Sequence, residues 1–209
     1  MSGRFITLEG GEGTGKSTQS KRLVKAFEAR GIACVATREP GGSPGAEDIR
    51  KLLVTGEPGR WDALTEMLLL FAARADHVTR TIQPALEAGK FVICDRFTDS
   101  TYAYQGVGRG TPRETIRRIE SVVLEDFKPD LTLILDLPVD TSLLRALARG
   151  SEESRYEKFD VQFHENLRQA FLDIAKRAPD RCVVIDATGS EDDVAAAIWK
   201  AVSSRFSIS

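Results

Sequence analysis

The residues best suited to chemistry form a glycine-rich stretch near the N-terminus, from Gly10 to Ser17. They match the pattern G-x-x-x-x-G-K-[ST], in which glycines let successive backbone N–H groups point inward at phosphate oxygens. Lys16 can reach the β- and γ-phosphates of a nucleotide, and the Ser17 hydroxyl can ligate Mg²⁺. A glycine-rich turn without a ligand is the alternative, but all four fixed positions are present between an apolar run and a helical pattern. We therefore predict a site for a nucleoside triphosphate with magnesium. It is formed by Gly10, Gly11, Glu12, Gly13, Thr14, Gly15, Lys16, Ser17 and Thr18.

The elements that must position this loop alternate between short β-branched runs and longer amphipathic patterns. The runs predict strands at Arg4–Glu9, Ile32–Arg38, Phe91–Asp95, Leu131–Asp136 and Cys182–Asp186. The other patterns predict helices at Lys16–Arg30, Gly45–Leu53, Asp62–Glu87, Pro112–Glu125, Thr141–Arg149, Glu157–Ala178 and Asp192–Ser203, with C-caps at Gly31, Gly89 and Gly150. Near-continuous apolar runs are typical of parallel strands covered on both faces. We expect an α/β fold of the P-loop NTPase type, a five-stranded parallel sheet with its ligands at the carboxyl ends of the strands.

Composition limits the possible classes of protein. The chain has 209 residues, which suits one domain over residues 1–209, and a net charge of −2 that argues against a polymeric nucleic acid as partner. No apolar run is long enough to cross a membrane, and the first strand begins too early for a signal peptide. The three cysteines lie in apolar runs without metal-binding spacing, as expected of buried free thiols in a cytoplasmic protein: Cys34, Cys94 and Cys182.

An aspartate ends three of the predicted strands, at Asp95, Asp136 and Asp186. Any of them could help to hold magnesium through water, but only Asp95 is followed directly by an arginine. Arg96 beside that acid suits a second anionic substrate near the γ-phosphate. A local surface ion pair is the alternative, and the position at a strand end favours the functional interpretation.

Further patterns are weaker when each is taken alone. The segment 38–45, with two prolines and three glycines, predicts a shaped loop after the second strand, although it could be a simple connection. Phe71 and Arg74 lie three residues apart on one helix face, so they could stack on a planar base and bind its edge. Without further context, a core phenylalanine and an exposed arginine would be favoured. Three polar residues able to read a base or sugar follow Asp95: Thr101, Tyr104 and Gln105.

Two features concern movement and assembly. Over residues 145–157 a helix ends at Gly150 in an arginine-bearing segment, which predicts a short lid whose Arg149 and Arg155 neutralise the transferring phosphoryl group. A solvated polar loop is an equally good interpretation of that segment alone. The helix at 62–87 has a broad apolar stripe, which suggests packing against another subunit: Leu64, Met67, Leu68, Phe71 and Ile82.

Taken in order, these patterns make the chain resemble the thymidylate kinases, nearly from end to end. The most specific matches are Arg38-Glu39-Pro40-Gly41-Gly42, Phe71-Ala72-Ala73-Arg74, Asp95-Arg96-Phe97 and Ala103-Tyr104-Gln105-Gly106. The resemblance implies phosphorylation of dTMP to dTDP with MgATP and a homodimer formed through long helices. Glu12-Gly13-Thr14 contains no arginine, which is similar to the bacterial arrangement in which the lid supplies the catalytic cation. Phe97 departs from relatives that have tyrosine or histidine there.

The resemblance also implies roles for individual residues. Phe71 would stack on thymine, Arg74 would bind its edge, and Tyr104 would pack under the sugar and disfavour a ribose 2′-hydroxyl. The catalytic residues would be Lys16, Arg96, Arg149 and Arg155. The substrate-binding residues would be Glu12, Arg38, Pro40, Phe71, Arg74, Arg96, Ser100, Thr101, Tyr104 and Gln105. The metal would be held by Ser17 and Asp95.

Two alternatives stay open at this point. The first is a kinase for another small acceptor, such as a different nucleotide or a deoxynucleoside. Phe71, Arg74 and Tyr104 are the discriminating residues, because a pocket for a base and a deoxyribose requires them and a non-nucleotide acceptor does not. The second is a regulatory P-loop ATPase, which would have no pocket for a phosphate acceptor and would ignore dTMP.

Overall fold

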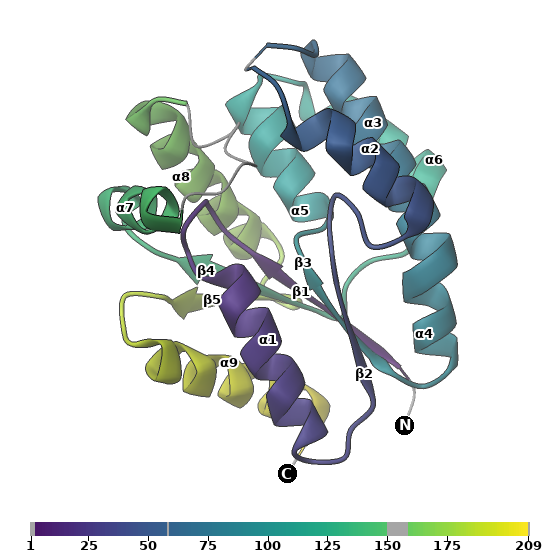
Figure 1. Ribbon diagram of the computed structural model, residues 1–209, viewed down its shortest axis with the longest axis vertical. Helices are drawn as coiled ribbons and strands as arrows, with labels where there is room; N and C mark the ends of the chain where they lie inside the picture. Colours follow the sequence, from purple (N-terminus) through teal and green to yellow (C-terminus); the bar gives the residue numbers. More distant parts are fainter. Residues whose placement is uncertain (1–2, 58, 150–158, 209) are drawn as a thin grey trace.

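A sheet of parallel strands in the order β2-β3-β1-β4-β5 forms the centre of the molecule (Figure 1). The computed structural model describes residues 3–57, 59–149 and 159–208. The strands are β1 (Arg4–Glu9), β2 (Cys34–Arg38), β3 (Phe91–Asp95), β4 (Leu131–Asp136) and β5 (Cys182–Asp186). β1 is central, with Leu8 opposite Asp95 on β3 and Glu9 opposite Ile134 on β4. The glycine-rich loop therefore leaves the middle of the sheet at its carboxyl edge.

Helical segments follow each strand, as the alternating pattern predicts. They are α1 (Lys16–Glu28), α2 (Pro44–Val54), α3 (Ala63–His77), η1 (Val78–Ile82), α4 (Gln83–Glu87), α5 (Thr98–Thr101), η2 (Tyr102–Gly108), α6 (Arg113–Leu124), α7 (Val139–Arg149), α8 (Val161–Arg177) and α9 (Glu191–Phe206), of which η1 and η2 are π-helical. Within the described ranges, every helix is too short or too polar to cross a lipid bilayer.

The core has two sides because neighbouring strand residues point to opposite faces of the sheet. Ile6 and Leu8 of β1 belong to a cluster with Phe27 of α1 and with α9, and Figure 1 shows α1 and α9 side by side on that face. Phe5, which directly precedes Ile6, packs on the other side with Ile82 of η1. The prediction of a parallel sheet covered on both faces is thus confirmed, and the covered strands hold the carboxyl edge rigid.

The long helix predicted over 62–87 is interrupted. Asp62 caps its start, accepting hydrogen bonds from the backbone N–H groups of Leu64 and Thr65 at 3.0 Å. The segment then changes to π-helical turns at η1 before continuing as α4. Pro84 explains the change, because it has no N–H to donate to the carbonyl four residues earlier.

Several helices and strands begin or end at residues other than those predicted. The second strand begins at Cys34 rather than at Ile32, and α8 begins at Val161, where Asp160 accepts a hydrogen bond from the backbone of Phe163. Gly31 and Gly89 have φ values of 67° and 74°, as expected of C-caps, whereas Gly150 lies outside the described residues. The helical segment over residues 98–108 was not expected, because its glycine and small polar residues give no helical stripe.

Candidate active site

The glycine-rich loop connects β1 to α1 with the geometry that phosphate binding requires. Gly10, Gly13 and Gly15 have φ values of 134°, 71° and 92°, which side chains disfavour. A Cβ on Gly13 would lie 1.9 Å from the carbonyl oxygen of Ser142, so the loop also needs glycine for its close approach to α7. No side chain caps α1 at Gly15. The loop and the first turn of α1 thus leave backbone N–H groups available to an anion.

Lys16 is buried, and its Nζ donates hydrogen bonds to the carbonyl of Gly11 at 2.6 Å and to Oγ1 of Thr14 at 3.4 Å. Burial lowers the pKa of the Lys16 ammonium to about 8, and the nearby charge of Arg96 adds to the effect. The ammonium therefore sits against the loop that the sequence assigns to phosphates. Thr18, the last residue of that predicted set, is exposed on α1.

The three strand-end aspartates have different partners. Asp95 Oδ2 accepts a hydrogen bond of 2.6 Å from Oγ of Ser17 in the first turn of α1. Asp136 pairs with Arg168 through two hydrogen bonds of 2.7 and 2.9 Å, and Asp186 accepts two from Thr188 in its own turn. Of these three aspartates, only Asp95 thus faces the serine of the glycine-rich loop.

Arg96 follows β3 in the left-handed region, with a φ of 72°. Its guanidinium donates hydrogen bonds to the carbonyl of Gly10 at 3.0 Å, to Ser100 Oγ at 3.1 Å and to the Glu12 carboxylate at 3.0 Å, and it lies 4.9 Å from the ring centroid of Tyr104. Tyr104 donates to the same Glu12 oxygen at 2.8 Å. Arg96, Glu12 and Tyr104 therefore form one cluster over the loop.

Arg74 is 2% exposed, which excludes the simple exposed arginine that its sequence position would otherwise favour. Its guanidinium lies between two rings, 4.9 Å from the centroid of Phe71 and 5.1 Å from that of Phe97. It donates to Glu39 at 2.7 Å and to Thr101 Oγ1 at 3.1 Å. Among the described residues, Nη1 of Arg74 has no hydrogen-bond partner, so this buried cation retains a donor for a ligand.

The remaining predicted substrate residues lie around this cation at different depths. Phe71 is 1% exposed and packs on Met67 and Ile116. Gln105 is buried on η2 and donates a hydrogen bond of 2.9 Å to Glu66. Arg38 is more exposed and pairs with Glu47 at 3.2 Å, while the carbonyl of Pro40 accepts a hydrogen bond from Arg50 at 2.6 Å.

The two predicted lid arginines cannot be placed, because the Arg149 side chain and all of Arg155 lie outside the described residues. The lid predicted at 145–157 is described only through the end of α7, where Arg145 donates to the carbonyl of Ala187 at 3.4 Å.

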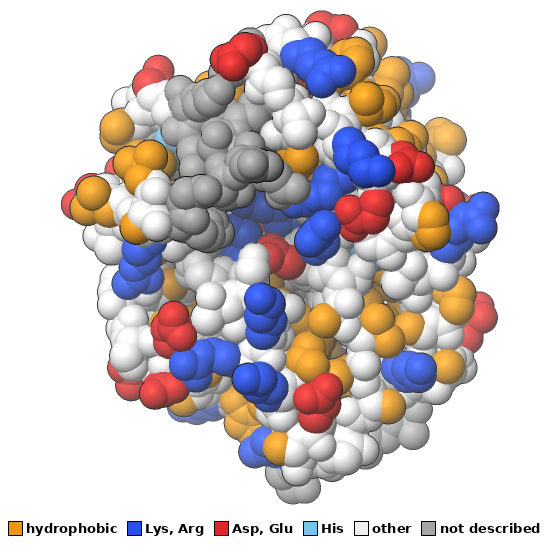
Figure 2. Space-filling model, viewed as in Figure 1, with side chains coloured by type: hydrophobic (Ala, Val, Ile, Leu, Met, Phe, Trp, Pro, Cys, Tyr) orange, Lys and Arg blue, Asp and Glu red, His pale blue; other side chains and the backbone are white. Residues whose placement is uncertain are grey.

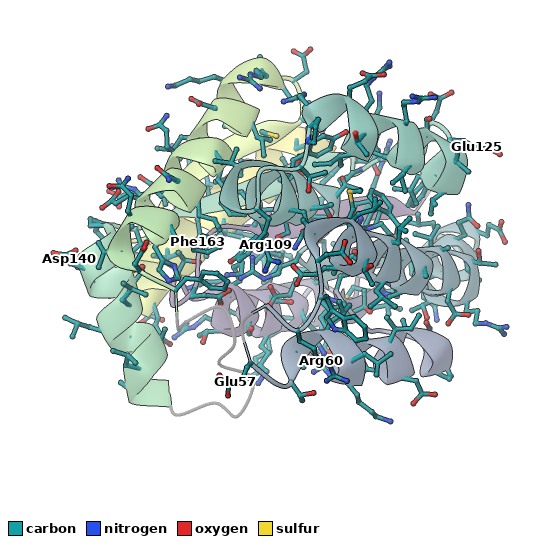
Figure 3. The ribbon with its side chains drawn as sticks, turned by 90° about the horizontal axis from the view of Figure 1, so that it is seen from above. Glu57, Arg60, Arg109, Glu125, Asp140 and Phe163 are labelled. Carbon is teal, nitrogen blue, oxygen red and sulfur yellow. The ribbon has the colours of Figure 1, made fainter. Side chains whose placement is uncertain are left out.

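Figures 2 and 3 show where charged side chains and several labelled residues lie in the molecule. Figure 2 shows Lys and Arg side chains gathered in a hollow near the middle of the face seen in Figure 1. Seen from above in Figure 3, Arg109 and Phe163 lie toward the middle of the molecule, while Glu125 and Asp140 lie at opposite edges. Arg109 pairs with Glu66 at 3.8 Å and so extends the network around Gln105.

Sequence reasoning missed three acids and a histidine that lie around Arg74 and the turn at Arg96. Glu39 binds Arg74 and, at 3.0 Å, Nδ1 of His77. Asp99 forms a bidentate pair with Arg181 at 2.7 and 2.8 Å. Glu9 accepts hydrogen bonds from the turn that contains Arg96. The available signal was position, since each acid lies within three residues of the glycine-rich loop, the second loop or Arg96.

This fold and these contacts define a P-loop phosphotransferase, in which Arg96 contacts the nucleotide loop and the buried cation Arg74 lies beside the turn that follows Arg96. A family model for thymidylate kinase matches residues 8–198. The chain therefore belongs to the thymidylate kinase family, whose members phosphorylate dTMP with ATP.

Individual relatives agree over the full length. A thymidylate kinase of Caulobacter vibrioides is 53% identical over 206 residues, which cover 99% of each chain. One of Magnetococcus marinus is 48% identical over 209 residues, which cover all of both chains. The crystal structure of thymidylate kinase from Ehrlichia chaffeensis is 36% identical, with a TM-score of 0.78, and the match covers 97% of this chain and 99% of that one.

Proposed function

We propose that this chain, as one domain over residues 1–209, transfers the γ-phosphoryl group of ATP to the phosphate of dTMP with Mg²⁺ as cofactor, giving ADP and dTDP. The observation that carries the proposal is the position of Arg96. Its guanidinium lies 3.0 Å from the carbonyl of Gly10 in the nucleotide loop and 3.1 Å from Ser100, at the start of the helical segment that carries Thr101 and Gln105. A cation between the two substrates can hold the acceptor phosphate close to the transferring group.

The reaction needs positioning and charge stabilisation rather than a general base, because a phosphate oxygen of dTMP is already ionised at neutral pH. Lys16 would turn from the carbonyl of Gly11 to the β- and γ-phosphates. Arg96 would exchange its bond to Glu12 for the acceptor phosphate. The lid arginines Arg149 and Arg155 would cover the transferring group and exclude water.

Recognition of thymine would centre on Arg74. Its unpartnered Nη1 supports a hydrogen bond to the edge of the base, and its bonds to Glu39 and Thr101 fix the guanidinium plane. Phe71 would contribute an aromatic surface, Gln105 an amide, and Tyr104, held by Glu12, would lie under a deoxyribose. Arg38 and Pro40 would border the acceptor from the second loop.

The residues present suit magnesium. Ser17 Oγ and Asp95 Oδ2 are 2.6 Å apart, and both are hard oxygen donors of the kind that Mg²⁺ uses beside nucleotide phosphates and water. The ion would neutralise phosphate charge when it is bound. Ser17 and Asp95 would orient the ion and its waters, which is the role we propose for both side chains.

Asparagine at Asp95 is expected to raise the Mg²⁺ concentration that gives half-maximal activity by about tenfold, because the amide keeps the shape but loses the charge. The measurement is a titration of activity with Mg²⁺ at a fixed ATP concentration. Asp136→Asn is the matched control, since Asp136 also ends a strand but pairs with Arg168. Equal shifts in the two variants would contradict the role of Asp95.

The experiment that tests the function is an assay of ADP release with MgATP and a panel of acceptors: dTMP, dUMP, dCMP, AMP, GMP, thymidine and none. We expect strong preference for dTMP and little release without an acceptor. Preference for another monophosphate would overturn the roles of Phe71, Arg74 and Gln105. Release that is independent of every acceptor would indicate a regulatory ATPase or a hydrolase instead.

We also propose a cytoplasmic homodimer formed through α3 and α6. Only part of the apolar stripe predicted on the long helix is buried within the chain. Met67 and Phe71 are buried, whereas Leu64 and Leu68 are 50% and 48% exposed. Val122 on the neighbouring α6 is 82% exposed. The three free cysteines suit a reducing compartment.

The dimer is expected to dissociate when charge is placed on this surface. Leu64→Glu combined with Leu68→Glu should sediment as a monomer, while Leu144→Glu, at a more exposed position on α7, should not change the sedimentation of the protein. A wild-type protein that sediments as a monomer would remove the proposal.

A further inference from the structure

Glu9 is the last residue of β1, directly before the glycine-rich loop, and its side chain is completely buried. Burying a carboxyl group costs free energy unless its oxygens are hydrogen-bonded. The partners of Glu9 therefore indicate why an acid stands at this position of an otherwise apolar strand.

Within the described residues, the hydrogen-bond partners of the Glu9 carboxyl all lie in the turn that follows β3. Oε1 accepts hydrogen bonds from the backbone N–H of Phe97 at 2.7 Å and of Ser100 at 3.4 Å. Oε2 accepts one of 2.6 Å from Oγ of Ser100. One side chain of β1 thus satisfies the first backbone groups of the segment 97–100, where no side chain of that segment caps the helix.

This turn contains Arg96 in an unfavourable backbone conformation. Arg96 has a φ of 72°, and non-glycine residues persist in that region only when their surroundings hold them there. The backbone N–H of Arg96 donates to the carbonyl of Leu8 at 2.9 Å, and the next N–H donates to Glu9. Two successive residues of β1 therefore fix the backbone on both sides of the Arg96 side chain.

A second connection runs through side chains. Ser100 Oγ donates to Glu9 and accepts a hydrogen bond of 3.1 Å from Nη1 of Arg96. The direction of the guanidinium toward the glycine-rich loop is thus set by Ser100, whose hydroxyl is oriented by Glu9.

Burial and nearby charges shift the pKa of the Glu9 carboxyl. Burial, with a contribution from Asp99, raises the pKa of the Glu9 carboxyl to about 8, while Arg96 acts in the opposite direction. Asp99 itself is neutralised by Arg181. Both oxygens of Glu9 accept hydrogen bonds in the structure, whereas a glutamine keeps the shape of the side chain but only one accepting oxygen.

We infer that Glu9 is a positioning residue for phosphoryl transfer, which fixes the turn and the guanidinium of Arg96 so that they meet the acceptor phosphate. The inference rests on the proposed role of Arg96. It assigns to Glu9 an effect on the use of dTMP that is separate from the binding of ATP by the adjacent loop.

The experiment compares steady-state kinetics and melting temperatures of Glu9→Ala, Glu9→Gln and Ser100→Ala with those of the wild type. Glu9→Ala is expected to lower kcat/KM for dTMP by about a hundredfold, the usual cost of a small misplacement, while the melting-temperature shift produced by ATP is retained. Glu9→Gln keeps one oxygen for the backbone N–H groups but cannot accept from Ser100 as well, so it should recover only part of the loss. Ser100→Ala should show about a tenfold loss, because only the side-chain connection is removed.

Thr7→Val is the matched control, because Thr7 is buried on the same strand and its hydroxyl, within the described part of the chain, bonds only to Thr132, at 2.9 Å. It should lower the melting temperature without changing kcat/KM for dTMP. Equal kinetic losses in Thr7→Val and Glu9→Ala would reduce Glu9 to a structural residue and overturn the inference.

A double-mutant cycle separates this inference from the proposed function. If Glu9 acts through Arg96, Glu9→Ala should add less than about threefold to the loss already caused by Arg96→Ala. If the losses of Glu9→Ala and Arg96→Ala are fully additive, the inference is contradicted, even when the wild type uses dTMP as its acceptor. If Glu9→Ala does not fold, the same cycle with Ser100→Ala decides in its place. Failure of the wild type to use dTMP would instead remove the proposed function.

Discussion

Replacing Arg96 by alanine is expected to lower kcat/KM for dTMP by about a thousandfold or more, because a cation aimed at a transferring phosphoryl group supplies much of its stabilisation. The guanidinium is already directed at the nucleotide loop by Gly10, Ser100 and Glu12. Little reorganisation is needed when the acceptor arrives, apart from release of Glu12. The loss should therefore affect kcat as well as KM.

Steady-state kinetics with varied dTMP at saturating MgATP provide the measurement. Arg96→Lys separates charge from geometry: lysine keeps the positive charge but has no planar fork to hold two oxygens, so it should restore only a small part of the activity. Arg22→Ala is the control, since Arg22 forms a solvent-exposed pair with Asp192. Turnover within tenfold of the wild type in Arg96→Ala would contradict the assigned role.

The sheet and the nucleotide loop could be predicted from the sequence because their signals are local. Apolar runs covered on both faces have few possible structures, and four fixed positions of the glycine-rich loop must follow a strand. Even the choice of Asp95 among three strand-end acids followed from one neighbouring residue, Arg96. In the structure only Asp95 among those three accepts a hydrogen bond from Ser17, and its role toward magnesium stays a prediction.

The side chains that hold the site residues in place could not be predicted, because their contacts depend on which distant residues the fold brings together. Glu39 was visible in the sequence as part of a loop, but its bonds to Arg74 and His77 span 35 and 38 residues. The burial of Arg74 follows from those bonds, since an unpaired arginine would stay exposed. Glu9 is similar: its position was evident, but its contacts with the turn at Arg96 require the pairing of β1 with β3.

Lys16→Met is expected to reduce kcat by about a thousandfold, because it removes the cation nearest the phosphates but keeps an unbranched side chain that fills the same space. Lys16 is 6% exposed and its ammonium donates to the carbonyl of Gly11, so little water surrounds the charge and its effect on a phosphate is strong. Removing a buried charge also relieves a desolvation cost, so the variant should fold as well as the wild type.

A loss of turnover without a loss of stability in Lys16→Met distinguishes a catalytic cation from a structural one. Lys21→Met, at an exposed position on the same helix, provides the control and should leave both kcat and the melting temperature unchanged. We expect Lys16→Met to keep its melting temperature while losing turnover, as measured by thermal unfolding and by ADP release with dTMP. A variant that loses stability in proportion to activity would show that the ammonium mainly holds the loop in place, and the charge at the transferring phosphoryl group would then have to come from Arg96 and the lid.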